Sequence, residues 1–510
     1  MGPVAFPIFL TSGMENFSLF RYQTPSAYRQ GNGESILQAL SCCLPMHTFF
    51  YDELSEYPRE LYSGKTKNKE EQIQPFPVRA AQMDDKWEGG CIPATINDQW
   101  NYLLSTIWDQ MIHLVIRFDG MLSEPALASA VRSACEAEPL TAMRFQEGEP
   151  PYFIQDPDAL ARTYAVITTT DPDAALRMLL TEPLDPATGP QARVRLIRSD
   201  SDLLCISVNH TISDAYGVKT FGSRIARLYH AQSAPATFLP LKNFHDRSFE
   251  SVLRLFSPAE REEAFLKYGD QVSSWSVPMK SCTTRDPDYT VARFHPGVLS
   301  SIKARAGKLG VTVNDVLLSA FTLVLAESVP ELRKNALPVL TSIDLRRYLS
   351  PDSFPSLANL SVAFEVPVMT TPGTSFSTVV NRVHAAMDER KRGHAGIGAA
   401  ERLCRDFSGG YEQVKLHLQK LDLEAREGRL EKNPFFSNLG VIPESVFDYG
   451  PVPVAEAWML PPVEYPPGFG LAASTCRGSL SLATGYCSRA LPGKEVSAIL
   501  ERMAVLLSDG

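Results

Sequence analysis

The chain has 510 residues, about two to three times the usual size of one hydrophobic core, so at least two lobes are expected. Its 44% hydrophobic and 21% charged residues are typical of a globular protein and exclude a disordered chain. A net charge of -9 and a pI near 5.6 argue against a broad basic surface for nucleic acid or anionic membranes.

Two further features that the sequence lacks narrow the class of protein to be expected. No run approaches the ~18 consecutive apolar residues of a membrane span, and no secretory signal opens the chain. The nine cysteines have no CxxC spacing, which favours reduced thiols over disulfides or a metal site. We therefore expect a cytoplasmic protein with no metal and no membrane span.

The organisation changes near residue 95. Residues 1–95 carry Gly/Pro punctuation and a charged patch, so they are interpreted as an N-terminal arm of undefined role. Beyond it, strand-like runs alternate with helical periodicity, which predicts an α/β fold. A stretch at 271–289 has neither period and separates an N-terminal lobe, 96–275, from a C-terminal lobe, 285–510.

Several elements of the second half have clear boundaries. Gly310 is expected to close one helix, and Thr312 with Asp315 forms a capping box that opens the next. Arg477 and Gly478 mark a hairpin turn. The predicted elements are helices at 295–310, 312–328, 375–391 and 494–508, and strands at 336–345, 360–368, 470–476 and 479–487.

One HxxxD motif, from His210 to Asp214, lies in a context that favours a catalytic role. His210 ends an apolar strand, and Asp214 is a suitable N-cap for the helix that follows at 215–231. An HxxxD spacing alone is weak evidence, because about half of one is expected by chance at ordinary composition. A second one, His384 and Asp388, lies in a polar helix and is interpreted as a solvated pair. The alternative for His210 is a buried structural histidine.

The string SVNHTISDAYG around His210 resembles the active-site motif of the condensation-domain and alcohol O-acetyltransferase superfamily, which is related in fold to chloramphenicol acetyltransferase. The resemblance extends over roughly 100–510 and is nearest in character to stand-alone fungal acetyltransferases of secondary metabolism. It implies two chloramphenicol acetyltransferase-like lobes with a tunnel between them. Further segments match in the expected order, namely 182–197, 312–321, 342–349, 358–364 and 435–442.

The motif departs from the superfamily pattern in two places. Peptide-forming condensation domains carry tandem histidines and a glycine after the aspartate, whereas this chain has Asn209 before His210 and Ala215 after Asp214. These departures favour ester formation over amide synthesis. The plant-type DFGWG element is absent, and SNLG at 437–440 stands at a loosely comparable position.

The resemblance assigns His210 as the general base, because a neutral alcohol is a poor nucleophile near pH 7. It makes Asp214 structural at the active site, paired with an arginine. Arg346 is the first candidate for that arginine and Arg144 the second. The candidates for an oxyanion or substrate contact are Asn438, Ser437 and Asn209.

The expected function is transfer of an acyl group, acetyl from acetyl-CoA as co-substrate, to a hydroxyl of a secondary metabolite, with no bound cofactor. Its partners are then an acyl thioester donor and a small-molecule alcohol acceptor. One alternative is transfer of a polyketide chain from an acyl carrier protein. The other is a repurposed scaffold that binds a metabolite or directs a cyclisation or pericyclic step, with His210 as a polar contact.

Overall fold

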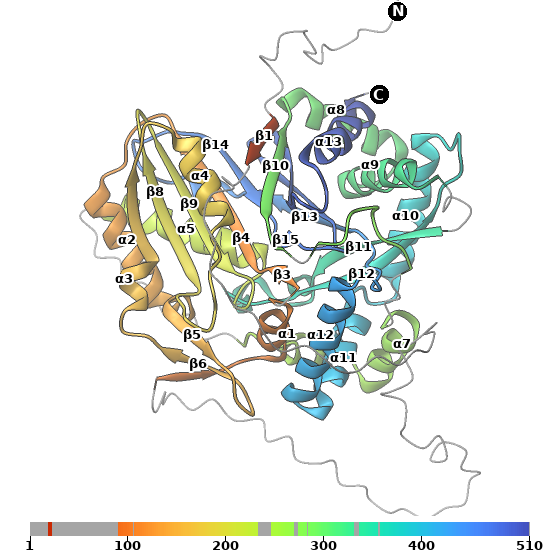
Figure 1. The fold of residues 1–510 in the computed structure, drawn as a ribbon, viewed down its shortest axis with the longest axis horizontal. Helices are drawn as coiled ribbons and strands as arrows, with labels where there is room; N and C mark the ends of the chain where they lie inside the picture. The colour runs from red at the N-terminus through yellow and green to blue at the C-terminus, as the bar shows by residue number, and fades with distance from the viewer. Residues whose placement is uncertain are drawn as a thin grey trace, which may run out of the picture. The chain divides into compact units, whose positions relative to one another are not determined.

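An α/β fold in two lobes is confirmed by the computed structural model (Figure 1). The structure describes residues 19–22, 90–105, 107–232, 246–269, 274–282, 284–330, 336–354 and 357–508. Most of the arm predicted at 1–95 lies outside these residues. Within the arm, β1 (Leu19–Tyr22) pairs antiparallel with β10 (Pro287–Arg293).

The N-terminal lobe is built on a five-stranded sheet with an antiparallel centre. Its strand order is β14 (Val454–Leu460), β4 (Met111–Phe118), β9 (Asp202–Asn209), β8 (Ala192–Arg198) and β7 (Tyr164–Thr168). A three-stranded sheet has the order β2 (Cys91–Pro93), β6 (Tyr152–Gln155) and β5 (Met143–Gln146). The helices of this half are α1 (Ile96–Leu104), α2 (Glu124–Ala137), α3 (Ala159–Thr163), α4 (Pro172–Thr181), α5 (Ala215–Gln232), α6 (Glu250–Leu253) and α7 (Pro258–Tyr268).

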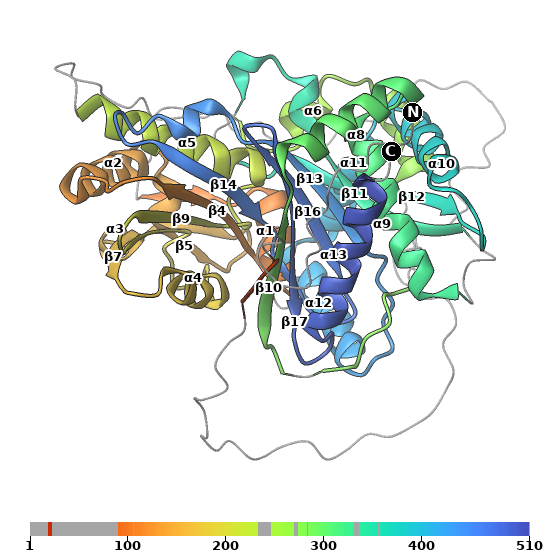
Figure 2. The same ribbon diagram turned by 90° about the horizontal axis from the view of Figure 1, so that it is seen from above.

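Helices cover both faces of the five-stranded sheet, with α2 and α5 on one side and α4 on the other (Figure 2). The sequence alternation explains this arrangement, since successive side chains of a strand point to opposite faces. Leu114 and Ile116 of β4 belong to the core beneath α5, whereas Val115 belongs to the core beneath α4. Because both faces are covered, all eight residues of β9 are buried.

The C-terminal lobe is built on a nine-stranded sheet. Its main path continues from β10 through β17 (Ser479–Cys487), β16 (Gly470–Cys476), β13 (Phe435–Val441) and β11 (Ala336–Asp344) to β12 (Ser361–Met369). The short β15 (Val463–Glu464) joins β17 to β3 (Trp108–Asp109). The helices are α8 (Pro296–Leu309), α9 (Val313–Ser328), α10 (Phe376–Arg392), α11 (Ile397–Asp406), α12 (Tyr411–Arg426) and α13 (Gly493–Ser508), with 3-10 turns at Leu345–Tyr348, Pro351–Ser353, Phe407–Gly409 and Glu444–Phe447.

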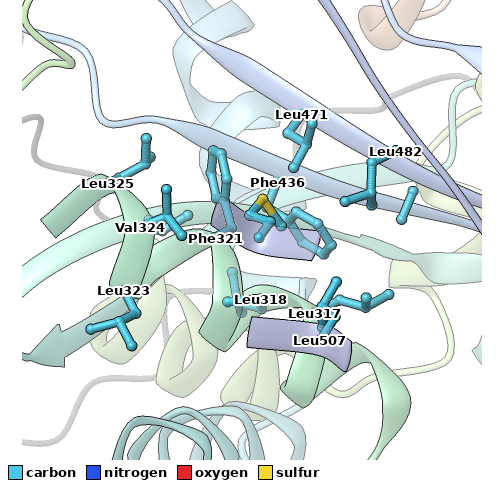
Figure 3. Close-up of a cluster of buried hydrophobic side chains, with 14 of the residues drawn as sticks. Leu317, Leu318, Phe321, Leu323, Val324, Leu325, Phe436, Leu471, Leu482 and Leu507 are labelled. Carbon is cyan, nitrogen blue, oxygen red and sulfur yellow. The ribbon is translucent and has the colours of Figure 1, made fainter. Parts of the chain in front are cut away.

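Helix α9 forms the centre of the second core. Its residues from Asp315 to Ala326 are all buried, which is typical of a helix enclosed by other elements. Figure 3 shows side chains of α9 meeting Phe436 of β13, Leu471 of β16, Leu482 of β17 and Leu507 of α13. The helix therefore holds the sheet and the last helix together.

Each lobe contributes one strand to the sheet of the other lobe, and the predicted lobe boundaries do not account for this exchange. Strand β14 falls in the 285–510 segment, yet it pairs with β4 at the edge of the N-terminal sheet. In the other direction, β3 falls in the 96–275 segment and pairs with β15 of the C-terminal sheet. The predicted division at 271–289 therefore does not keep these two strands with the segment whose sheet they join.

The local predictions for the second half are confirmed. Gly310 follows α8 with a φ of 68°, and the Thr312–Asp315 capping box opens α9. Arg477 and Gly478 both have positive φ in the β16–β17 turn. His384 lies on α10 as predicted, but it bonds Asp315 Oδ2 at 2.8 Å, so it ties α10 to α9 as well as facing Asp388.

The described helices and cysteines bear on membrane spans and on disulfides. Among the described helices, none by itself has the length and apolar character needed to cross a bilayer. One pair of helices, α8 with α9, together has the length and composition of a membrane span, but the two helices are bent by 102° relative to each other. Six cysteines of the described residues are free thiols, namely Cys135, Cys205, Cys282, Cys404, Cys476 and Cys487.

Candidate functional site

His210 sits in the loop between a buried strand and a buried helix. Its backbone N–H donates to Gln110 O at 2.6 Å, so the β4–β9 ladder extends one residue beyond Asn209. The loop ends at Asp214, whose Oδ1 accepts from the Gly217 N–H at 3.2 Å and caps α5. The strand end and the helix start together leave the loop little freedom.

The imidazole of His210 is oriented by Asn359, a residue of the other lobe. Asn359 Nδ2 donates to His210 O at 2.7 Å and to Thr211 O at 3.1 Å, and these two carbonyls fix which end of the amide is the donor. Asn359 Oδ1, 2.9 Å from His210 Nδ1, must therefore accept a hydrogen bond. His210 consequently carries its proton on Nδ1 and presents a free lone pair on Nε2.

The electrostatic surroundings keep this imidazole neutral. Burial is the largest effect and lowers the pKa of His210 below 6.5, because imidazolium loses solvation. The charge of Asp214 and the Asn359 hydrogen bond act in the opposite direction with smaller effect. The unprotonated form, which can accept a proton, is thus the resting state near neutral pH.

The carboxylate of Asp214 pairs with Arg346. Arg346 Nη1 lies 2.7 Å from Asp214 Oδ2, and both side chains are buried. The same carboxylate oxygen accepts from the Leu360 N–H at 2.9 Å. Burial opposes the ionisation of Asp214, but Arg346 outweighs it, so the pKa of Asp214 is lowered. Both oxygens of the Asp214 carboxylate are therefore engaged by the loop, by Arg346 and by Leu360, and among the described residues no hydrogen bond joins them to the His210 imidazole.

Arg346 extends this ion pair into a clamp between the lobes. Its Nη2 donates to Ala358 O at 3.0 Å, and its guanidinium carbon lies 4.4 Å from the centre of the Tyr216 ring. The Asp214 N–H donates to the same Ala358 carbonyl at 3.1 Å. The loop before α5 is thereby joined to the segment that carries Asn359.

A second clamp involves Arg247, which lies before α6. Its guanidinium pairs with Asp98 Oδ1 at 2.8 Å and donates to Leu357 O at 2.6 Å and Ile212 O at 3.3 Å. Asp98 is also the capping-box residue of α1. Three distant segments therefore meet at one guanidinium beside the His210 loop.

Comparisons with known proteins agree with this architecture. Residues 104–330 match the condensation-domain family model. The chain has the condensation-domain fold. This confirms the predicted resemblance and, with it, the two chloramphenicol acetyltransferase-like lobes. No curated protein sequence matches the chain.

Three solved structures illustrate the likeness, each over 82% of this chain. The first condensation domain of the calcium-dependent antibiotic synthetase is 16% identical over 96% of its own length, with a TM-score of 0.61. TRI3 trichothecene 15-O-acetyltransferase from Fusarium sporotrichioides is 13% identical over 94%, with a TM-score of 0.60. Polyketide synthase associated protein 5 from Mycobacterium tuberculosis is 17% identical over 98%, with a TM-score of 0.57.

Within this condensation-domain fold, two predicted site residues have structural contacts instead. Arg144 of β5 donates to Gln146 Oε1 at 3.3 Å and does not join the Asp214 pair, because Arg346 holds that position. Asn209 is buried, and its Oδ1 accepts from the Thr211 N–H at 2.9 Å while its Nδ2 donates to Leu184 O at 3.1 Å. With both ends of its amide engaged, Asn209 shapes the loop and is a poor candidate for a substrate contact.

The two β13 candidates lie at a bulge in the condensation-domain sheet. Asn438 is exposed, and its Oδ1 accepts from the Gly440 N–H at 3.0 Å, which is a turn-forming contact. Ser437 Oγ is 3.1 Å from Ser342 Oγ. The structure brings neither side chain into contact with His210, so the predicted oxyanion donor has to be sought elsewhere.

The sequence does not predict Asn359 or Arg247 as a site residue. The sequence carried one signal for Asn359, since it lies in the segment 358–364 that resembles the superfamily. For Arg247 there was none, because its partner Asp98 is far away in sequence.

We expect Asn359→Ala to lower kcat by ~10- to 100-fold, since the imidazole loses its fixed tautomer and a displaced catalytic group can cost about 10²-fold. Steady-state kinetics would measure it. A positioning role also predicts that added imidazole leaves the loss unrepaired, while Asn359→Asp, which keeps the acceptor oxygen, recovers part of kcat. A variant with unchanged kcat and a lower melting temperature would reduce Asn359 to a stabilising residue.

Proposed function

We propose that this protein is an O-acyltransferase that moves an acyl group from a thioester to a hydroxyl, with His210 as general base. The observation that carries the proposal is the imidazole held by Asn359, with a free lone pair on Nε2 and a lowered pKa. A histidine in this state can accept a proton at neutral pH.

The proposed reaction balances without a covalent enzyme intermediate. His210 Nε2 takes the proton of the acceptor hydroxyl as the hydroxyl oxygen attacks the thioester carbonyl carbon. The tetrahedral intermediate collapses, the C–S bond breaks, and the imidazolium returns the proton to the leaving sulfur. Both substrates meet at one imidazole, so positioning supplies much of the rate.

The proposed donor is acetyl-CoA, used as a co-substrate with no bound cofactor, and the proposed acceptor is a hydroxylated secondary metabolite. The likeness to TRI3, a trichothecene 15-O-acetyltransferase, supports this chemistry through the shared fold. The loop of His210 belongs to one lobe and Asn359 to the other, so the site lies where the lobes meet. We propose that the substrates reach it through a tunnel between the lobes.

The test is release of free CoA from acetyl-CoA in the presence of a panel of hydroxylated terpenoid and polyketide acceptors, with the acylated product identified by mass spectrometry. Acceptor-dependent release with one ester formed per CoA supports the proposal. If acetyl-CoA is inert but an acyl chain on a carrier protein is transferred, the donor is wrong and the reaction class stands. No transfer from any thioester would overturn the function.

The pH dependence of kcat/KM should show an acid limb below pH 6.5. The active base is neutral His210, and its lowered pKa means that protonation occurs only at lower pH than for a free histidine. Activity therefore persists down to that pKa and falls below it. Measuring kcat/KM between pH 4.5 and 8 in overlapping buffers checks this, and an acid limb above 6.5 would contradict it.

A further inference from the structure

The side chain of Gln110 is buried without a partner. Only 3% of the residue is exposed, and neither Nε2 nor Oε1 has a hydrogen-bond partner among the described residues. A buried amide left unpaired destabilises a fold, and most buried polar groups are paired. Such a group calls for an explanation in function, and Gln110 lies at the site proposed above.

Strand pairing places Gln110 beside His210. Met111 is opposite Asn209, and the 2.6 Å bond from His210 N to Gln110 O continues the ladder, so Gln110 is opposite His210. Side chains directly opposite in an antiparallel pair share a face, with Cβ atoms about 4.5–5.5 Å apart. The next pair along that face, Ile112 and Val208, shows the arrangement, because both belong to the core beneath α5. The register therefore places Gln110 and His210 opposite each other at the end of the β4–β9 ladder.

The other amides near His210 are already engaged. Asn359 bonds the imidazole and two carbonyls, and Asn209 bonds a backbone N–H and a carbonyl. Asn438 is exposed and bonds Gly440. Of the buried amides among these four, Gln110 alone has an N–H donor without an acceptor in the described structure.

We propose that Gln110 Nε2 donates a hydrogen bond to the thioester carbonyl oxygen as it becomes an oxyanion. The inference rests on the acyl-transfer function proposed above and adds the group that stabilises its tetrahedral intermediate. The hydroxyl oxygen attacks the carbonyl carbon, the carbonyl π electrons move to oxygen, and Gln110 stabilises that charge until the C–S bond breaks. A donor shielded from water is worth more to a developing charge than one in solvent.

The test compares Gln110→Leu with the wild type in the acetyl-CoA assay. Removing an oxyanion donor is expected to lower kcat by ~10²- to 10³-fold while KM for acetyl-CoA changes by less than ~3-fold. Because the amide has no protein partner to lose, the melting temperature should stay unchanged or rise. Loss of rate without loss of stability is the combination that a structural amide would not give.

Two further variants sharpen the result. Gln110→Met keeps the length of the side chain but has no N–H to donate to an oxyanion, so it should be as slow as Gln110→Leu. Gln191→Leu is the matched control, since that buried amide donates to Met143 O and Pro186 O. It should lower the melting temperature and leave kcat of the folded protein within ~3-fold.

The outcomes separate this inference from the function on which it rests. If the wild type turns over, His210→Ala does not, and Gln110→Leu matches the wild type, the role of Gln110 is overturned and the acyltransferase stands. Wild-type rate in Gln110→Met would overturn it too. If the wild type transfers no acyl group from any thioester, both proposals fail together.

Discussion

Replacing His210 by alanine is expected to lower kcat by ~10²- to 10⁴-fold, the usual contribution of a general base. This corresponds to about 2.7–5.4 kcal/mol of transition-state stabilisation. Among the described residues the imidazole makes one side-chain hydrogen bond, to Asn359, and its loss leaves the Asp214–Arg346 pair and the backbone of the loop intact. Stability should change little, so the effect belongs to the chemistry. Steady-state CoA release with the best acceptor measures it.

The matched control is His384→Ala, because His384 heads the second HxxxD spacing in the chain. His384 bonds Asp315 at the start of α9, so its removal should lower the melting temperature while kcat stays within ~2-fold. Activity that survives His210→Ala would point instead to a scaffold in which His210 is a polar contact. Equal losses in both variants would trace the effect to folding.

Much of this fold could be predicted because its signals are local. The α5 helix follows from an apolar face at Val218, Phe221 and Ile225, all of them buried, and from Asp214 as its cap. The β9 strand follows from a continuous apolar run. Arg346 as the partner of Asp214 came from the resemblance to a family, since no spacing rule links two residues 132 positions apart.

What could not be predicted depends on contacts that no local pattern encodes. Asn359 becomes a partner of His210 only when the lobes meet, and Gln110 becomes its neighbour only through the register of β4 on β9. The exchange of β14 into the first sheet is also a pairing across the whole chain. Asn438 is an oxyanion candidate because SNLG stands at a position loosely comparable to a C-terminal element of the superfamily, but at the bulge its side chain accepts from the Gly440 N–H as a turn-former.

Arg346→Met is expected to destabilise the protein by about 3–5 kcal/mol, the usual cost of removing one partner of a buried ion pair. Asp214 would remain buried with its charge, and the Ala358 carbonyl would lose a donor. Methionine keeps much of the volume, so little of the loss comes from a cavity. Urea unfolding followed by circular dichroism gives the change in the free energy of unfolding.

A double variant tests whether the loss comes from the stranded charge. Asp214→Asn with Arg346→Met removes both charges, so the pair should recover at least ~1–2 kcal/mol relative to Arg346→Met alone, because no unpaired carboxylate remains. The activity of the double variant should still be low, since the hydrogen bonds that join the His210 loop to the Asn359 segment include the Arg346–Ala358 bond. Additive losses in stability would contradict the coupling and make Asp214 and Arg346 independent supports of the loop. Recovered stability with recovered activity would instead mean that the two lobes hold the catalytic histidine through Asn359 and Arg247, without this ion pair.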